Sequence, residues 1–96
     1  MEIDAIILSE SDNVATVLTE IDAGLTIKIR KGDELILFKS AEKIPYGYKI
    51  TLEKIETGQK IIKYGEVIGQ ATTRIAPGCV AHVHNIESLR GRGDLD

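Results

Sequence analysis

The sequence lacks tryptophan and holds only three tyrosines and one phenylalanine, so aromatic side chains contribute little to any core. Its one cysteine, Cys79, excludes a disulfide within the chain. Iron–sulfur clusters usually take several cysteines, so we expect none held by this chain alone. Apolar runs, such as residues 5–8 and 35–38, are too short to span a bilayer. The first residues lack the basic and apolar regions of a signal peptide. We therefore expect a cytoplasmic protein with no membrane role.

An excess of positive charge is also absent. Twelve Lys and Arg face fifteen Asp and Glu, for a net charge of -3, and no basic run is interleaved with aromatics, so we expect no nucleic-acid partner. Glycine-rich phosphate-binding motifs are missing, and no serine or cysteine has a base at recognisable spacing. Hydrophobic residues nevertheless reach 43% of the 96 residues, which indicates one small globular domain with an aliphatic core.

Most of the chain has the pattern of short β-strands. β-branched and alternating apolar residues predict strands at residues 3–8, 25–30, 35–38, 49–52, 60–63, 67–71 and 80–85. Turn residues separate them, at 31–34, 45–47, 56–59, 64–66 and 76–78, and the Pro-Gly order in the last suits a type II turn. We find no internal repeat.

The segment between residues 11 and 24 has a different period. Ser11 or Asp12 is placed to cap a helix, and Gly24 is placed to end it. Between them apolar residues recur at i, i+3, i+4 and i+7, namely Val14, Val17, Leu18 and Ile21. The sequence therefore predicts a mainly β domain of short strands and turns with one N-terminal helix.

Two histidines near the end of the chain are candidate site residues. A strand over residues 80–85 would place His82 and His84 on one face, roughly 6.6–7 Å apart, where both imidazoles could reach one metal ion or one substrate. A metal site needs three or four ligands, and spacing identifies no third. The alternative is that both are half-exposed strand residues bonded to their neighbours.

Lys49 is a second candidate, because it begins a strand directly after the turn at residues 45–47, from which an ammonium group could reach a substrate carboxylate. A solvated strand end is the simpler alternative. Residues 89–96 are rich in glycine and charge, so we expect a domain at residues 1–88 and a flexible C-terminal tail.

Six segments of the chain together carry a resemblance to known proteins. They are Asp12-Asn13-Val14-Ala15, residues 44–50, residues 62–69, residues 75–78, His82-Val83-His84-Asn85 and residues 87–94. In this order they resemble the small subunit or N-terminal domain of altronate and galactarate dehydratases and of sulfolactate sulfo-lyase. The resemblance covers nearly the whole chain, and the Lys-Tyr-Gly-Glu and His-x-His-Asn segments are its most specific parts.

The resemblance implies a β-clip fold of the SAF type and a lyase that removes water or sulfite from a hydroxy acid. It implies a divalent metal, iron(II) or manganese(II), which this chain could share with a separate large subunit, and a small subunit that is inactive alone. The family commonly has Gly-His-Lys where this chain has Gly47-Tyr48-Lys49, so a role for that histidine does not carry over to Tyr48.

On this resemblance we expect His82 and His84 to serve a metal or proton-transfer site and Lys49 to pair with the substrate carboxylate. Asn85, Arg90 and Arg92 are expected to bind substrate, and either arginine could instead anchor the large subunit. Two alternatives stay open: a non-catalytic module that binds a carbohydrate acid or a protein, and a structural subunit that stabilises the large one. The hydroxy acid is undetermined, and a homo-oligomer is possible if an apolar patch is left exposed.

Overall fold

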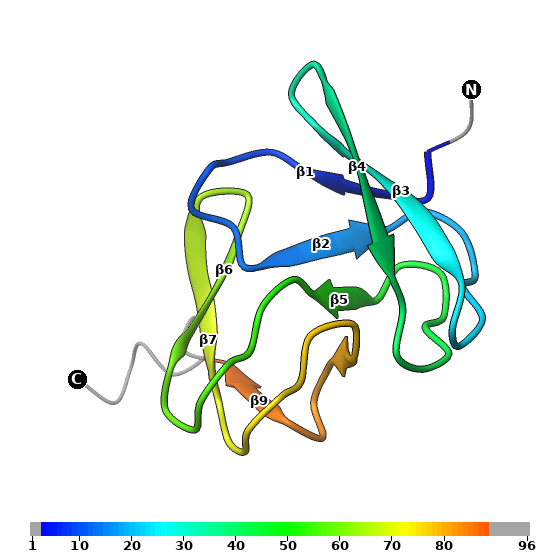
Figure 1. Cartoon of the computed structure of the whole chain (residues 1–96). Coiled ribbons are helices and arrows are strands. Elements are labelled where there is room, and N and C mark those ends of the chain that lie inside the picture. Colours follow the sequence, from blue (N-terminus) through cyan, green and yellow to red (C-terminus); the bar gives the residue numbers. More distant parts are fainter. Residues whose placement is uncertain (1–2, 89–96) are drawn as a thin grey trace.

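The computed structural model describes residues 3–88, which form strands, bridges and turns but no helix (Figure 1). The mainly β expectation is confirmed, and no helix of these residues could cross a membrane. The nine strands found in the described range are β1 (Ala5–Ile7), β2 (Val14–Val17), β3 (Thr26–Lys31), β4 (Glu34–Lys39), β5 (Lys49–Thr51), β6 (Lys60–Lys63), β7 (Glu66–Ala71), β8 (Val80–Ala81) and β9 (Ile86–Ser88).

The strands form two sheets. A six-stranded sheet has the order β4-β3-β1-β2-β5-β8, and a three-stranded sheet has the order β6-β7-β9. The β1–β3 pair is parallel and the other strand pairs are antiparallel. Two aliphatic clusters fill the interior, one built around Ile21, Ile27 and Ile50 and the other around Ile55 and Ile61.

The predicted N-terminal helix is wrong, because Val14–Val17 is strand β2. Its apolar spacing comes from burial on both sides. The side chain of Val14 packs in the second cluster, whereas Ala15 and Val17 pack in the first. A strand between two cores lacks the apolar–polar alternation of a half-exposed strand, so the spacing of its apolar residues can resemble that of a helix. The carboxylate of Asp12 accepts the N–H of Gly65 at 2.8 Å and caps no helix.

The expectation of no internal repeat is also wrong. Four Ile-x-x-Gly turns recur, each with a buried isoleucine and a glycine in the left-handed region, where a side chain is rarely tolerated. Their isoleucines pair as two isolated antiparallel bridges, Ile21 with Ile44 and Ile55 with Ile75. The turns lie at residues 21–24, 44–47, 55–58 and 75–78.

These turns divide the chain into two similar halves. In the first half, residues 21–51, the β3–β4 hairpin lies between two turns and is followed by β5. In the second half, residues 55–81, the β6–β7 hairpin lies between two turns and is followed by β8. The glycine N–H of each leading turn donates to the end of its hairpin, Gly24 to Ser40 at 3.0 Å and Gly58 to Ala71 at 2.8 Å.

Asn13 joins the second hairpin to the six-stranded sheet. Its side chain is buried, with Nδ2 donating to the carbonyl of Lys60 at 2.9 Å and Oδ1 accepting the N–H of Ile62 at 2.8 Å. Its own carbonyl accepts the N–H of Leu52, directly after β5, at 3.0 Å. One residue thereby fixes β6 relative to β5.

Candidate functional site

A groove lies where the two sheets meet. Lys49 at the start of β5 and Lys63 at the end of β6 line it together with His82, and its volume is about 360 Å³. A register shift in the β6–β7 hairpin pairs Ile61 with Gly69 and Ile62 with Val67, which leaves the intervening residue of β7 without a β6 partner. Such bulges redirect side chains. The other residues that line the groove are Ile68, Val83, Ile86 and Ser88.

The two lysines make the groove cationic. Burial lowers the pKa of Lys49 below its ordinary value, and the charge of Lys63 lowers it further. Lys63 also places its Nζ 5.1 Å from the ring centre of Tyr64. Two like charges in one groove favour an anion between them, because a negative group relieves both the repulsion and part of the desolvation.

His82 is held at the groove by Tyr48. The two rings lie with their centres 4.1 Å apart and their planes at 31°. Tyr48 directly precedes Lys49, so the position where the family resemblance expected a histidine instead supplies a packing surface for the half-buried His82. The ring contact therefore holds the imidazole in place in the groove lining.

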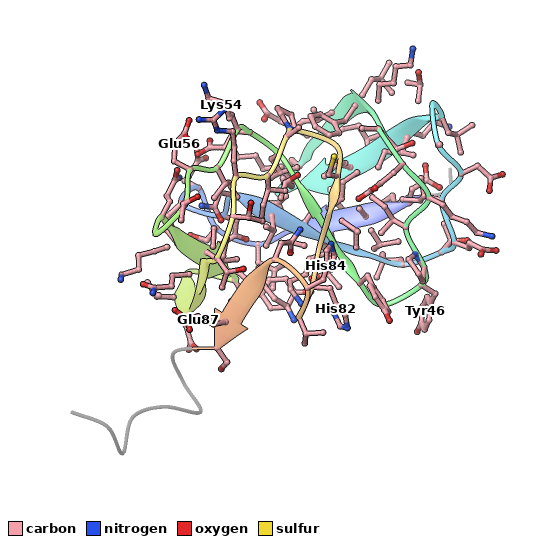
Figure 2. The ribbon with its side chains drawn as sticks, turned by 90° about the horizontal axis from the view of Figure 1, so that it is seen from below. Tyr46, Lys54, Glu56, His82, His84 and Glu87 are labelled. Carbon is pink, nitrogen blue, oxygen red and sulfur yellow. The ribbon has the colours of Figure 1, made fainter. Side chains whose placement is uncertain are left out.

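The strand expected over residues 80–85 is wrong beyond Ala81, because β8 covers only Val80–Ala81 and residues 82–85 form a turn. Both histidines belong to the segment between β8 and β9 (Figure 2). His84 is exposed and is not part of the groove lining. The argument that alternation places both imidazoles on one strand face therefore fails, and their assignment to one site stays a prediction.

Asn85 closes this turn. Its Oδ1 accepts the N–H of His82 at 2.9 Å and its Nδ2 donates to the carbonyl of Val80 at 2.9 Å. The residue is 6% exposed, and its carbonyl accepts the N–H of Thr72 at 2.9 Å. The side-chain amide thus holds the His82 loop in place, and binding of substrate by Asn85 stays a prediction.

Two further expectations are the substrate-binding arginines and the metal site. Arg90 and Arg92 lie outside the described residues, as does the expected tail at 89–96. Residues 3–88 contain no group of three or more His, Cys, Asp or Glu side chains able to hold a metal ion. The described residues therefore do not fit a complete metal site, and iron(II) or manganese(II) shared with another chain stays a prediction.

Lys63 is the site residue that the sequence interpretation missed. It lies in the Lys-Tyr-Gly-Glu segment, where Tyr64, with a φ of 55°, and Gly65, with a φ of 80°, form a two-residue turn. The signal was present in the sequence as a lysine beside a turn, the same context that singled out Lys49. What could not be foreseen is that Asn13 would bring the two lysines to one groove.

Comparisons with known proteins agree on one family. The sequence profile described as the altronate/galactarate dehydratase SAF domain matches residues 3–89. The (2R)-sulfolactate sulfo-lyase subunit alpha of Chromohalobacter salexigens is 31% identical over 93 residues, covering 94% of this chain and 99% of that protein.

Two enzymes of Escherichia coli are similar over a small part of their length. Altronate dehydratase is 32% identical over 85 residues, covering 88% of this chain and 16% of the enzyme. Galactarate dehydratase (L-threo-forming) is 42% identical over 69 residues, covering 72% of this chain and 12% of the enzyme. The chain thus matches a whole subunit of one relative and a small fraction of the others.

Proposed function

Because the chain belongs to the altronate/galactarate dehydratase SAF domain family, we propose that it acts as the small subunit of a hydro-lyase or sulfo-lyase for a sugar acid or related hydroxy acid. In this proposal the groove at Lys49, Lys63 and His82 binds the anionic end of the substrate. A separate large subunit supplies the rest of the active site, and the small subunit is inactive alone. The alpha-subunit name of the sulfo-lyase relative supports a partner chain.

The observation that carries this proposal is the pair of lysines from different sheets in one groove. Nothing in the packing of an aliphatic β domain calls for two ammonium groups whose charges disfavour each other. A carboxylate between them resolves that conflict. His82, held against the ring of Tyr48, lies in the same groove and can donate or accept one hydrogen bond.

The proposed reaction removes a proton from the carbon beside the carboxylate while hydroxide or sulfite leaves the neighbouring carbon with its bonding electrons. A base takes the proton, and positive charge stabilises the charge that builds up on the carboxylate. Lys63 and Lys49 would supply that positive charge. His82, which lies in the same groove, is the candidate in this chain to accept the proton.

The test is a reconstitution with the candidate large subunit, assayed on altronate, galactarate and sulfolactate under reducing conditions with iron(II) or manganese(II). We expect turnover in the mixture and none with either chain alone. Lys49→Met and Lys63→Met should each raise KM or lower kcat about 10- to 100-fold, as expected for a lost charge-assisted contact. Lys28→Met, on the exposed face of β3, is the matched control and should leave turnover unchanged.

Other results would favour the alternatives. Equal turnover by the large subunit alone would contradict a catalytic contribution and leave a structural role. Binding of the hydroxy acid to this chain by calorimetry, lost in Lys49→Met and Lys63→Met but without turnover in any mixture, would indicate a binding module. A bound metal that appears only in the complex, and is lost with His82→Ala or His84→Ala, would support ligands shared between subunits.

A further inference from the structure

Strand β4 is one of the two edge strands of the six-stranded sheet and the longer of them, and its six residues pair only with β3 within residues 3–88. Leu35 and Leu37 point to its open face, where they are 43% and 68% exposed. On the other face, Ile36 and Phe38 line an apolar groove that is only partly covered. A long edge strand that is apolar on both faces is a site for pairing with another strand.

The second half of the chain shows the same position filled. Strand β7 is the counterpart of β4 in the second hairpin, and its outer side pairs antiparallel with β9. In the three-stranded sheet the hairpin is therefore completed by a third strand. The first hairpin has no such third strand at β4 within the described residues, so the same architecture leaves one strand position vacant.

The direction of the free backbone groups on β4 follows from the hairpin. Lys31 and Glu34 flank the two-residue turn at Gly32 and Asp33 and face each other across it. Residues that flank such a turn form a hydrogen-bonded pair, and the pattern then alternates along the strands. Glu34, Ile36 and Phe38 thus direct their N–H and C=O groups to β3, and Leu35 and Leu37 direct theirs outward.

We propose that β4 pairs antiparallel with β4 of a second copy of this chain, about a two-fold axis at Ile36. In this register Leu35 lies opposite Leu37 of the other copy, and their outward N–H and C=O groups form the hydrogen-bonded pairs. Ile36 lies opposite its own equivalent in a non-hydrogen-bonded pair. The two sheets become one continuous sheet, and the interface is isologous, as closed two-fold symmetry requires.

Charge complementarity identifies the second copy as the occupant. In the register centred on Ile36, Asp33, the turn residue directly before β4, lies at the level of Lys39 of the other copy. Both side chains are exposed, and no hydrogen bond or ion pair of either is found in the part of the chain that the structure describes. A centre at Leu37 would place Lys39 opposite Leu35, and a centre at Leu35 would place Lys39 opposite Lys31. Either move loses both charge pairs.

The ends of the strand favour the same register. The Gly32–Asp33 turn ends β4 on one side, and on the other the turn at Gly78 lies against the backbone of Lys39 and Ala41. The free segment is therefore centred near Ile36. On the inner face, pairing would bring the apolar groove at Ile36 and Phe38 beside its equivalent in the other copy and cover side chains that one copy leaves partly exposed.

Sedimentation velocity of the full chain over a wide concentration range tests this proposal. We expect a monomer–dimer equilibrium that Leu37→Lys abolishes. Val67→Lys changes another exposed apolar residue, on β7, and should leave the equilibrium unchanged. Asp33→Lys places lysine opposite lysine twice and should weaken the dimer about tenfold. The double change Asp33→Lys with Lys39→Asp should restore it, and Glu53→Lys controls for net charge.

A cross-link tests the register independently. In a Cys79→Ser background, Ile36→Cys lies on the two-fold axis, so mild oxidation should give a disulfide-linked dimer. Glu34→Cys would lie opposite Phe38 and should not cross-link. Circular dichroism confirms that each variant folds. A monomer at every concentration, or a dimer indifferent to the Asp33 and Lys39 exchange, would overturn the proposal whatever the activity of the groove.

Discussion

The two halves of the chain are built from the same parts but are covered differently. In the second half Asn13 binds β6, and β9 pairs with β7, so both strands of that hairpin have neighbours. In the first half β1 pairs with β3, but β4 has no outer partner among the described residues. The β6–β7 hairpin, which has neighbours on both sides, places Lys63 in the groove, whereas the β3–β4 hairpin exposes Leu35 and Leu37.

This difference suits the two proposed roles of one small domain. The proposed anion groove requires a fixed hairpin, because the spacing of Lys49 and Lys63 would decide which anion they hold. The proposed pairing of β4 requires the opposite, backbone groups left free for another strand. We expect substitutions that loosen the β6–β7 hairpin to act on folding and on the groove, and substitutions on β4 to act on association.

Disrupting the pairing of β9 with β7 should have the largest effect on the free energy of unfolding. A Cβ at Gly69 would meet the backbone of Glu87 in β9, which cannot move without breaking the pairing. Gly69→Ala should therefore lower the free energy of unfolding by more than about 3 kcal/mol. Leu37→Ala, on the uncovered strand, should cost less than about 1 kcal/mol in the monomer. Urea unfolding of both variants would contradict this comparison if the two losses were equal.

Cutting the Asn13 link should come next. Asn13→Ala leaves the N–H of Ile62 and the carbonyl of Lys60 without their side-chain partner, at a cost of about 2 kcal/mol. Ser40→Ala is the first-half comparison, because the Ser40 hydroxyl donates to Asp22 and accepts from Leu25. Its cost should be about 1 kcal/mol. Hydrogen exchange should show faster exchange in β6 for the first variant and not for the second.

Anions should stabilise the folded domain through the groove between Lys49 and Lys63. A dicarboxylate at a concentration well above its Kd should raise the Tm of the wild type by about 4 °C. Lys49→Met and Lys63→Met should lose this shift, and Lys28→Met should retain it. Calorimetric scans at constant ionic strength separate site binding from general screening. An equal shift in all four proteins would remove the groove as an anion site.

The smallest effect is the pH dependence of Lys49. Its pKa in the folded state lies below the unfolded value, so the unfolded state binds more protons between the two and stability rises with pH in that interval. Lys49→Met should therefore be more stable than the wild type below this interval, and the difference should shrink as the pH approaches the unfolded pKa. Lys63→Met removes one cause of the lowered pKa, so it should narrow the interval between the folded and the unfolded pKa of Lys49. Urea unfolding as a function of pH measures the difference, and a difference that grows with pH would contradict the burial of Lys49.

Most strands could be predicted from local pattern, and β2 shows where local pattern fails. The hairpin strands β3 and β4 alternate or carry β-branched residues between clear turns, and they appear where the sequence placed them. In β2, Val14 and Val17 belong to different cores, so the spacing of apolar residues reports two neighbours and not one helical face. Tertiary packing decided this segment, and sequence period alone could not.

The site was predictable in its residue types and not in its assembly. His82 and Lys49 were identified and do line one groove. Strand alternation predicts that His84 shares a face with His82, whereas the side chain of Asn85, three residues after His82, accepts the His82 N–H and makes a turn. Lys63 was missed because its distance from Lys49 depends on the Asn13 contacts with β6, which have no local signature.

The paired isoleucine bridges have a kinetic consequence. Each hairpin can form early from contacts close in sequence, and the Ile21–Ile44 and Ile55–Ile75 bridges then close a loop around it. The chain thus contains two nuclei of similar size that can form in either order, and the parallel β1–β3 pairing is left for a late step. Chevron kinetics should therefore show Ile44→Val and Ile75→Val slowing folding by similar factors, with the rate limit set by docking of the two nuclei.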